Sequence, residues 1–294
     1  MDWKNGLIKI GRLNSPVVEQ TPVIWKGRLV LVETWQGHYW DKPPKKKKDY
    51  YVRIHDVETG GILGKCMEGY GFASALVWNE VLYVFAARDT GEPHPRDVNM
   101  SKTDDLINWS APKKVIVPDN PDEYVYNQSV CHDGKRFVMV YETNNPDYPP
   151  FTLKFAISDD LETWTKLPEA IYGADRYTAC PALRYAGGYY YMLYLEHLKR
   201  PKRWFETWLT RSKDLITWED APRRPVIAPD PDQDVHPDHP EGGKECNASD
   251  PDLVEWQGKT RVYFTGGDQH WGGNLQYAEF DGSMQEFFES YYKI

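Results

Sequence analysis

The sequence predicts an all-β fold, a five-bladed β-propeller, from three observations. A hairpin pattern occurs five times, a second motif follows three of the hairpins, and the composition favours strands and turns. The 294 residues include 12 Trp, 20 Tyr and 10 Phe, together with 22 Gly and 22 Pro. Aromatic residues are enriched in strands, whereas Gly and Pro are typical of turns. We therefore expect many short strands joined by tight turns.

Five segments have the pattern of a β-hairpin: two runs of β-branched and aromatic residues around a turn such as Lys26-Gly27 or Gln257-Gly258. The residues before the turns are Trp25, Trp78, His132, Tyr185 and Trp256, at intervals of 53, 54, 53 and 71. Radial repetition of four-stranded sheets makes a β-propeller. An open stack of sheets or a β-sandwich is the alternative, but sandwiches do not normally repeat at this period. Five units of about 55 residues span nearly the whole chain, so we expect one domain over residues 1–294.

A second motif, Ser-x-Asp-Leu-x-x-Trp, follows a strand-like run in three of the units. It occurs at residues 101–109, 158–164 and 212–218. Two stretches interrupt the period, residues 36–50 and residues 222–249. Long loops in compact domains often form lids or rims of functional sites, although the four lysines at 45–48 fit a solvated excursion equally well.

The charge balance argues against two classes of partner. Lys and Arg number 35 against 44 Asp and Glu, a formal net charge of −9. Nucleic-acid and membrane-surface binders need a cationic face, and no apolar run is long enough for a spanning helix. The first residues lack the basic start and apolar core of a signal peptide. We expect a cytoplasmic location, or a periplasmic or secreted one if a leader was removed.

The repeats resemble those of a known group of enzymes. Ser-x-Asp-Leu-x-x-Trp, the turn-centred hairpins and Asp250-Pro251 before the last hairpin are similar to the five-bladed glycosidases, which include family 43 arabinanases and xylosidases, family 32 fructosidases and family 117 agaro-oligosaccharide hydrolases. The resemblance implies a glycoside hydrolase with three carboxylates in a central pocket, near the starts of the inner strands. Only the fifth unit has the Asp-Pro pair. Units two and four have Phe72-Ala73-Ser74 and Ala179-Cys180-Pro181 there, so geometry must select the carboxylates.

Each hairpin brings the start of its first strand and the end of its second strand to the same end of the ring, because the two strands are antiparallel. Counting eight residues from the turn selects Arg88, Glu142 and Glu196, with Asp268 just beyond the matching point in the fifth unit. The acids at first-strand starts are Glu19 and Asp250.

Glycoside hydrolysis needs two carboxyl groups, one of them protonated, and clustered carboxylates raise one another's pKa. We predict that Glu142, Glu196 and Asp250 are catalytic. Simpler interpretations stay open, since a charge often ends an apolar strand where it meets water. Asp250 also fits a turn in Ser249-Asp-Pro-Asp252, and Asp252 fits a structural acceptor for backbone N–H groups.

Further polar and aromatic residues flank these positions and are predicted to bind the substrate. Aromatic rings suit stacking on sugars, for which Trp35 and Trp204 are further candidates, and an Arg can hold a carboxylate ionised or bind an acidic sugar. The predicted substrate-binding residues are Glu19, Arg88, Tyr126, Asn127, Asp175, Tyr177, His197, Asp268 and Trp271.

No metal or other cofactor is predicted. The loop at 230–239 contains four Asp and two His, but it lacks the Gly and closing Glu of a calcium loop, and Pro237 separates the His residues. The four cysteines lack the spacing of metal ligands. Cys131 and Cys180 lie on predicted inner strands, where a small buried thiol is the simplest interpretation.

The leading interpretation is a glycoside hydrolase that acts on an oligosaccharide or a plant or algal polysaccharide fragment. The narrow funnel favours exo action, and inversion with a Glu acid and an Asp or Glu base is the first expectation. One alternative is a polysaccharide lyase on uronic-acid glycans, with Arg88, His197 and Tyr177 as its cation and base. Another is a non-catalytic carbohydrate-binding propeller, because a fold does not fix a function.

Overall fold

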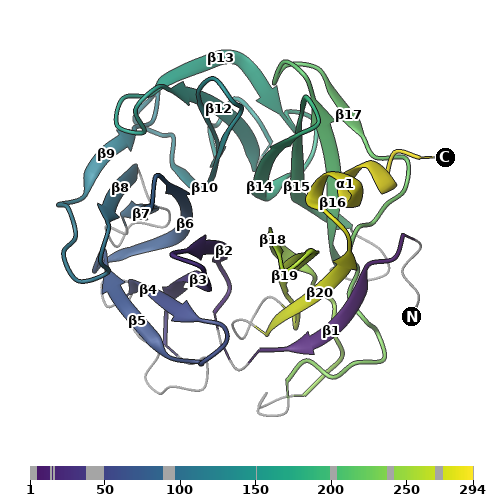
Figure 1. Ribbon diagram of the computed structural model, residues 1–294. Coiled ribbons are helices and arrows are strands. Elements are labelled where there is room, and N and C mark those ends of the chain that lie inside the picture. Colours follow the sequence, from purple (N-terminus) through teal and green to yellow (C-terminus); the bar gives the residue numbers. More distant parts are fainter. Residues whose placement is uncertain are drawn as a thin grey trace.

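Five four-stranded antiparallel sheets stand around one central axis in the computed structural model, as the blades of a five-bladed β-propeller (Figure 1). The predicted fold class is confirmed. The structure describes residues 5–13, 15, 17–37, 50–88, 97–149, 151–198, 204–236, 242–268 and 274–293. The predicted insertion at 36–50 lies mostly outside these residues.

In every blade the strands run in order from the axis to the rim. The inner strands of blades one to five are β2 (Gln20–Trp25), β6 (Tyr70–Trp78), β10 (Val125–His132), β14 (Ala179–Ala186) and β18 (Ser249–Trp256). The second strands are β3 (Arg28–Trp35), β7 (Val81–Arg88), β11 (Phe137–Thr143), β15 (Tyr189–Leu198) and β19 (Lys259–Thr265). The third strands are β4 (Tyr51–Asp56), β8 (Val98–Thr103), β12 (Thr152–Ser158), β16 (Trp204–Ser212) and β20 (Leu275–Asp281). The outer strands are β5 (Ile62–Cys66), β9 (Lys113–Ile116), β13 (Thr165–Tyr172), β17 (Trp218–Asp220) and, in blade five, β1 (Ile8–Arg12).

The inner hairpins turn as the sequence predicts, with one difference in length. Blades one, two, four and five use two-residue turns in which both residues have positive φ, for example Gln257 at 51° and Gly258 at 78°. This is the turn that matches the twist of paired strands. Blade three instead closes with four residues between His132 and Phe137. Positions in its second strand, counted from the turn, are therefore shifted relative to those in the other blades.

The Ser-x-Asp-Leu-x-x-Trp motif forms the connection between the third and outer strands. In blade four Ser212 Oγ accepts hydrogen bonds from the backbone N–H groups of Leu215, at 2.9 Å, and Asp214, at 3.2 Å. The indole of Trp218 donates to the carbonyl of Leu215 at 3.1 Å. The copy in blade two is the same, but its hydroxyl comes from Thr103 and not from Ser101. The motif is thus a self-capped turn.

Removing one such hydroxyl is expected to destabilise the blade measurably. Ser212 is buried, so Ser212→Ala leaves the buried N–H of Leu215 without its acceptor. We expect a loss of about 1–2 kcal/mol in the free energy of unfolding, measured by urea denaturation. Ile216 in the same turn is 54% exposed, and Ile216→Thr should change stability by less than about 0.5 kcal/mol. Equal effects of the two substitutions would contradict this role for the hydroxyl.

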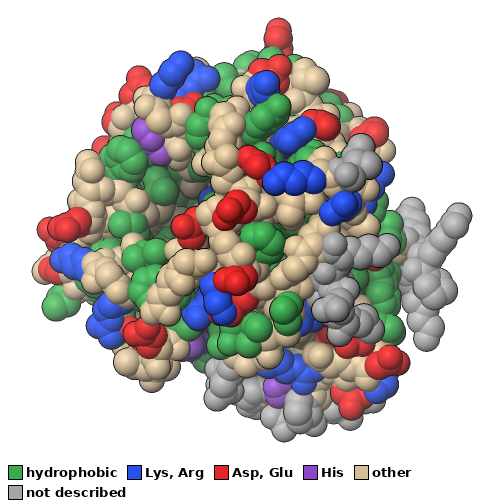
Figure 2. All heavy atoms as spheres, turned by 45° about the vertical axis from the view of Figure 1, so that its right-hand side comes forward, with side chains coloured by type: hydrophobic (Ala, Val, Ile, Leu, Met, Phe, Trp, Pro, Cys, Tyr) green, Lys and Arg blue, Asp and Glu red, His purple; other side chains and the backbone are tan. Residues whose placement is uncertain are grey.

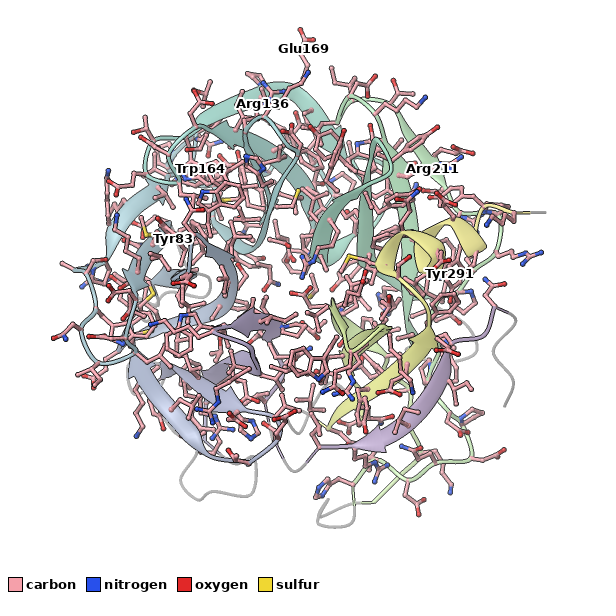
Figure 3. All side chains as sticks on the ribbon, viewed as in Figure 1. Tyr83, Arg136, Trp164, Glu169, Arg211 and Tyr291 are labelled. Carbon is pink, nitrogen blue, oxygen red and sulfur yellow. The ribbon has the colours of Figure 1, made fainter. Side chains whose placement is uncertain are left out.

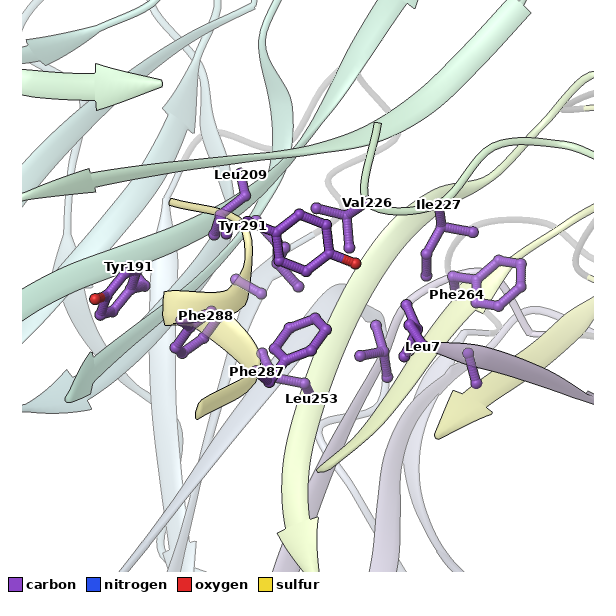
Figure 4. Packing of buried hydrophobic residues seen from close by; sticks show 14 of the residues in the cluster. Leu7, Tyr191, Leu209, Val226, Ile227, Leu253, Phe264, Phe287, Phe288 and Tyr291 are labelled. Atoms are coloured by element: carbon purple, nitrogen blue, oxygen red, sulfur yellow. The ribbon is translucent and has the colours of Figure 1, made fainter. Parts of the chain in front are cut away.

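The two ends of the described chain meet at blade five. Strand β1 pairs with β20 and thereby closes the ring, while the C-terminal helix α1 (Met284–Ser290) begins at a capping box between Ser283 and Glu286. Phe287 and Phe288 of α1 pack with Leu7 and Tyr191 in a buried cluster between blades four and five (Figure 4). The N-terminal strand and the helix therefore fasten the ring at its seam.

The long connection before blade five is anchored by Glu245, which is almost fully buried. Its Oε1 accepts a hydrogen bond from Gln233 at 2.9 Å and another from Gln276. Gly266 leaves room for this contact, because a Cβ atom there would lie 2.2 Å from Gln276 Nε2. The segment around Glu245 is therefore bound to blade five through Gln276.

Acidic and basic side chains are intermixed over the molecular face shown in Figure 2. The side chains labelled in Figure 3, such as Glu169 and Trp164, lie away from the central axis, in the outer parts of the blades. Among the described residues, no helix has the length and apolar character needed to cross a membrane.

Candidate active site

A pocket opens at the centre of the ring, where the inner strands begin. Its cavity volume is about 40 Å³, within a wider recess of about 330 Å³ that includes open solvent. Each blade contributes the same short segment to its wall. Glu19, Asn127 and Asp250, which the sequence analysis selected, lie there. The lining residues are Glu19, Gln20 and Thr21, Phe72, Ala73 and Ser74, Asn127 and Gln128, Cys180 and Pro181, and Asp250, Pro251 and Asp252.

Four of the inner strands carry a bulge at this wall. The register with the second strand shifts there in blades two to five. The residue at each shift has a positive φ: Phe72 at 55°, Asn127 at 46°, Cys180 at 49° and Asp250 at 50°. Residues other than Gly rarely adopt this conformation, and such strain is concentrated at functional sites. This feature recurs around one pocket, in four of the five blades.

Hydrogen bonds from neighbouring blades hold the strained segments in place. Gln20 Nε2 donates to the carbonyl of Asp250 at 2.9 Å, which joins blade one to blade five. Gln128 Nε2 donates to the carbonyl of Phe72 at 2.8 Å, which joins blade three to blade two. The two Gln residues each follow the wall residue of their own blade. Glu19 is therefore the blade-one equivalent of Asn127 and Asp250.

Three carboxyl groups meet at the pocket: Glu19, Asp250 and Glu142. Glu19 and Asp250 lie on the wall in adjacent blades and are partly exposed. Glu142 ends β11 behind the wall and is 2% exposed. The charges of Asp250 and Glu142 both raise the pKa of Glu19. The structure thus brings two of the three predicted catalytic acids together with a predicted substrate-binding acid.

Each of these carboxyl groups has its own hydrogen-bond donors. Glu142 Oε2 accepts from the backbone N–H of Cys180 at 2.9 Å and from Asn127 Nδ2 at 3.0 Å. Asp250 accepts from the hydroxyl of Ser249. Glu19 Oε2 accepts from Gln36 Nε2 at 3.1 Å. The donors fix the three groups in different environments.

Burial is the main cause of the raised pKa at all three positions. It raises the pKa of Glu19 to about 8, with a further contribution from the negative charge of Asp250. It raises the pKa of Glu142 to about 7, against the opposing effect of its two donors. The pKa of Asp250 is also raised by burial, against the effect of Ser249 and Cys180. Near neutral pH the pocket therefore holds at least one carboxyl proton, and Glu19 retains it most strongly.

An ion pair lies beside the pocket, further along the inner strands. Asp252 lies on the pocket wall, and one of its carboxylate oxygens binds the guanidinium of Arg184. Arg184 also donates to the carbonyl of Leu253 at 3.0 Å and to Ser129 Oγ at 3.4 Å. It thereby links blades three, four and five. The structural role predicted for Asp252 is confirmed, since its carboxylate also accepts from the backbone N–H of Leu253 at 2.7 Å.

Glu196 does not join the three carboxyl groups, and the predicted match between Glu142 and Glu196 is wrong by one residue. Glu142 pairs with Tyr126, whereas the residue in that position of blade four is Leu195, which pairs with Ala179. The count began at the turn, and the turn of blade three is two residues longer, whereas its second strand is one residue shorter up to the matching position, so the net error is one residue. A shift of one residue directs the side chain to the other face of the strand.

The environment of Glu196 is an ion-pair cluster between blades three and four. Its Oε2 lies 3.4 Å from Arg176 Nε. Arg176 also contacts Asp220 Oδ2 at 3.2 Å and the hydroxyl of Tyr172 at 2.6 Å. Burial raises the pKa of Glu196 to about 7, and Arg176 opposes that rise. Glu196 is thus a buried acid whose ion-pair partner is Arg176.

The remaining predicted substrate residues divide between the pocket and its surroundings. Arg88 is exposed, one residue beyond Ala87, which occupies the Glu142 position of blade two. Asp175 is 79% exposed and lies 3.7 Å from Arg176. Neither residue lines the described pocket wall. Asp268 is half-buried beyond the end of β19, and Trp271 lies outside the described residues.

Aromatic residues surround the blade-four side of the pocket. The ring of Tyr126 packs 5.1 Å from that of Phe72 on the pocket wall. Tyr177 packs at 5.4 Å from Phe151, and His197 stacks at 4.5 Å on Phe205. Phe151, Tyr177 and Phe205 belong to the same apolar cluster as Cys180.

Cys180 is the wall residue that the sequence interpretation missed. The expectation of buried thiols is confirmed for Cys131, whereas Cys180 is partly exposed and lines the pocket. The signal was present in the sequence, since Cys180-Pro181 occupies the place of Asp250-Pro251 one blade earlier. Within the described part of the chain, no group of three or more His, Cys, Asp or Glu side chains is arranged to hold a metal ion.

Comparison with known proteins bears on the fold. No protein-family model matches the sequence, and a search of curated proteins finds no match. Among solved structures, one titled glycoside hydrolase matches with a TM-score of 0.67 at 13% identity, over 94% of this chain and 93% of that chain. An α-L-arabinanase of Penicillium chrysogenum in complex with arabinobiose matches with a TM-score of 0.58 at 12% identity, over 90% of this chain and 76% of that chain.

A third match is an α-L-arabinofuranosidase of Fusarium graminearum in complex with an iminosugar inhibitor. Its TM-score is 0.59 at 13% identity, over 94% of this chain and 97% of that chain. A family 43 protein from Bacillus licheniformis is also similar. These likenesses confirm that the chain shares the fold of the five-bladed glycosidases that its repeats resemble.

Proposed function

We propose that the protein is a glycoside hydrolase that acts on an oligosaccharide by carboxylate acid/base catalysis in the central pocket. The observation that carries this proposal is the meeting of Glu19, Asp250 and Glu142 at the strained ends of the inner strands. Hydrolysis of a glycosidic bond requires a protonated and an ionised carboxyl group on its two sides. Structural neighbours that are named as glycoside hydrolases support the proposal.

The environments of the three groups suggest their roles. Glu19, with a pKa of about 8, keeps its proton at neutral pH and is partly exposed. It is therefore the general acid that protonates the leaving oxygen. Asp250 is also on the wall, and the hydrogen bond from the Ser249 hydroxyl favours its ionised form, so it is the general base that activates water. Glu142 lies behind the wall and supplies negative charge that keeps Glu19 protonated. This division assigns inversion of configuration, as expected from a separate acid and base.

Exo action is the mode that we propose. The ion pair of Arg184 and Asp252 ties blades four and five together further along the inner strands, so we infer that a sugar enters the pocket from the opposite end and that its chain leaves by the same opening. The substrate is then the terminal residue of an oligosaccharide, such as a fragment of a plant or algal polysaccharide. Arg88, the cation of the lyase alternative, is not on the described wall, and this favours hydrolysis.

A panel of plant and algal oligosaccharides tests the proposal. We expect new reducing ends, release from one chain end, and no near-ultraviolet absorbance from an unsaturated product. Proton NMR of the fresh product should show the inverted anomer. An unsaturated product would establish the lyase alternative. Binding without turnover across the panel would establish the carbohydrate-binding alternative.

The dependence of kcat/KM on pH should be a narrow bell close to neutral. Activity is lost above the pKa of Glu19, about 8, because the acid has lost its proton. Activity is lost on the acid side as the base and its neighbour Glu142, with a pKa of about 7, become protonated. A rate that keeps rising beyond pH 10 would contradict a carboxylic acid as proton donor.

A further inference from the structure

A second cavity lies at the other end of the inner strands from the central pocket. The central pocket is lined by the first residues of these strands, whereas this cavity is lined by later residues, next to the hairpin turns. Its volume is about 320 Å³, within a wider recess of about 770 Å³ that includes open solvent. We call it the turn-side cavity, and it is formed by residues 22–24, 75–77, 130–132, 184–185 and 253–254 together with Met284.

The wall of the turn-side cavity is mainly aliphatic, with two flat rings. The ring of His132 packs at 4.3 Å from that of Trp78, and the ring of Tyr185 packs at 5.0 Å from that of Tyr190. A concave, mostly apolar site of this size with a few polar groups is the usual form of a small-molecule site. The fixed rings of His132 and Tyr185 favour a ligand with a flat apolar body.

Arg184 supplies a hydrogen-bond donor to this cavity. Its side chain is 16% exposed and lines the turn-side cavity, not the central pocket. Its Nη1 donates to the carbonyl of Leu183 at 2.8 Å and to Ser129 Oγ at 3.4 Å. Its Nη2 donates to Asp252 and to the carbonyl of Leu253. A guanidinium has five N–H groups, and the fifth, Nε–H, has no acceptor among the described residues.

The charges at the turn-side cavity favour an uncharged ligand. Asp252 already balances the charge of Arg184, and burial raises the pKa of Asp252 even beside this partner. A second carboxylate on the same guanidinium would be repelled by Asp252 and would lose its hydration against the apolar wall. His132 Nδ1 accepts from the backbone N–H of Gly134 at 3.1 Å. A ring nitrogen that accepts carries no proton, so His132 is neutral and adds no charge.

We propose that the turn-side cavity is a second binding site, for a small uncharged molecule with a flat apolar body and an oxygen atom that accepts a hydrogen bond from Arg184 Nε. An aromatic ketone is the simplest molecule of this class. The inference does not depend on the proposed hydrolase activity, because it concerns the other end of the inner strands and its test needs no turnover.

Three naphthalene probes of similar shape test this chemistry on the unmodified protein. 2-Acetylnaphthalene has the acceptor oxygen, 2-isopropenylnaphthalene replaces that oxygen by carbon, and 2-naphthoate carries a charge. We expect the ketone to bind about three- to tenfold more tightly than the hydrocarbon, since one hydrogen bond separates them. The carboxylate should bind at least about tenfold more weakly than the ketone. Titration calorimetry at pH 7 measures the three affinities. Equal binding of ketone and hydrocarbon, tighter binding of the carboxylate, or no binding of the ketone would overturn the inference.

A cavity-filling substitution locates the bound probe. Val77 lines the turn-side cavity and is partly exposed, so Val77→Trp should fill part of the free space and weaken binding of 2-acetylnaphthalene at least about tenfold. Ile62 on β5 is 43% exposed and does not line the described cavity, so Ile62→Trp is the matched control and should bind normally. Tyr185→Ala, at a residue that is 37% exposed, is a second variant in case Val77→Trp does not fold, and it should bind the probe several-fold more weakly. Equal affinities in the cavity variant and the control would contradict the site.

A soaked crystal and sedimentation distinguish the other occupants of this cavity. We expect the ketone oxygen of 2-acetylnaphthalene within hydrogen-bond distance of Arg184 Nε, and an association state that Val77→Trp does not change. A probe bound only in the central pocket would overturn the inference. A dimer that Val77→Trp dissociates would show that a second copy of the chain covers the cavity, and this would overturn it as well.

Discussion

Glu19→Gln is expected to lower kcat/KM on the best oligosaccharide of the panel by about 10³-fold, because it removes the proton donor to the leaving oxygen. The amide has nearly the shape of the acid and can still contact Gln36 and the wall. Binding of substrate should therefore change little. The measurement is steady-state hydrolysis at pH 7, with a substrate that bears an activated leaving group as a second assay. Such a substrate needs less protonation and should recover part of the rate.

The same substitution should stabilise the protein at high pH. The pKa of Glu19 is about 8 in the folded protein and has an ordinary value of 4.5. The folded state therefore binds the proton more tightly than the unfolded state, and its stability falls as pH rises from about 4.5 towards 8. The uncharged amide of the Glu19→Gln variant has no such cost. We expect equal melting temperatures at pH 4.5 and a gain of a few degrees for the variant at pH 9.

Glu196→Gln is the matched control for this experiment. Glu196 is also a buried Glu with a pKa near 7, but its partner is Arg176 and it is not on the described pocket wall. Hydrolysis by Glu196→Gln should stay within about tenfold of the wild type. A complete loss of activity in Glu196→Gln, with normal activity in Glu19→Gln, would contradict the assignment of the site.

Arg184→Met is expected to have the largest effect on stability. It leaves the buried carboxylate of Asp252 without its ion-pair partner and removes the hydrogen bond to the carbonyl of Leu253. Removal of one partner of a buried ion pair costs about 3 kcal/mol or more in the free energy of unfolding. Chemical denaturation at pH 7 measures the loss.

The pH dependence of this loss identifies its cause. Burial already raises the pKa of Asp252, and Arg184 is the main group that opposes this effect. Without Arg184 the pKa rises further, so the folded variant takes up a proton and recovers stability as pH falls. Replacement of the acid as well, in Arg184→Met with Asp252→Leu, should also recover part of the loss. A penalty that neither lower pH nor the second substitution relieves would contradict the ion pair as its source.

The architecture was accessible from the sequence because its repeats carry local turn chemistry. Turns such as Gln257-Gly258 demand positive φ, and the alternation around them specifies a hairpin. The capped turn at Ser212 likewise forms within seven residues. The pairing of β1 with blade five could not be predicted in this way. It depends on the closure of the whole ring, which no local pattern encodes.

The site was predictable only in part, because it depends on register. The structure places Asp250 and Glu142 together, as the sequence predicts, since both lie near the start or end of an apolar strand at the same end of the ring. Glu196 was misplaced because the turn of blade three has two more residues than the turn of blade four, while its second strand reaches the matching position one residue sooner. The net shift is one residue, and in a strand one residue decides which face a side chain occupies.

The sequence interpretation listed Glu19 only as a substrate-binding residue and did not place Cys180 on the pocket wall, for a related reason. Each lies at a bulge or strand start, where propensity favours no particular side chain. Alignment of Glu19-Gln20 with Asn127-Gln128 would have identified the wall position in the sequence, because both Gln residues donate across to a neighbouring blade. The raised pKa of Glu19 depends on Asp250 and Glu142, more than 100 residues away along the chain.

The most direct test of the proposed active site is a crystal structure of Glu19→Gln soaked with the best oligosaccharide of the panel. The account predicts a terminal sugar in the central pocket, with its anomeric carbon between residue 19 and a water held by Asp250. The rest of the chain should leave through the same opening, above the pair of Arg184 and Asp252. A sugar bound only at the cluster of Arg176 and Glu196, with an empty central pocket, would contradict the account.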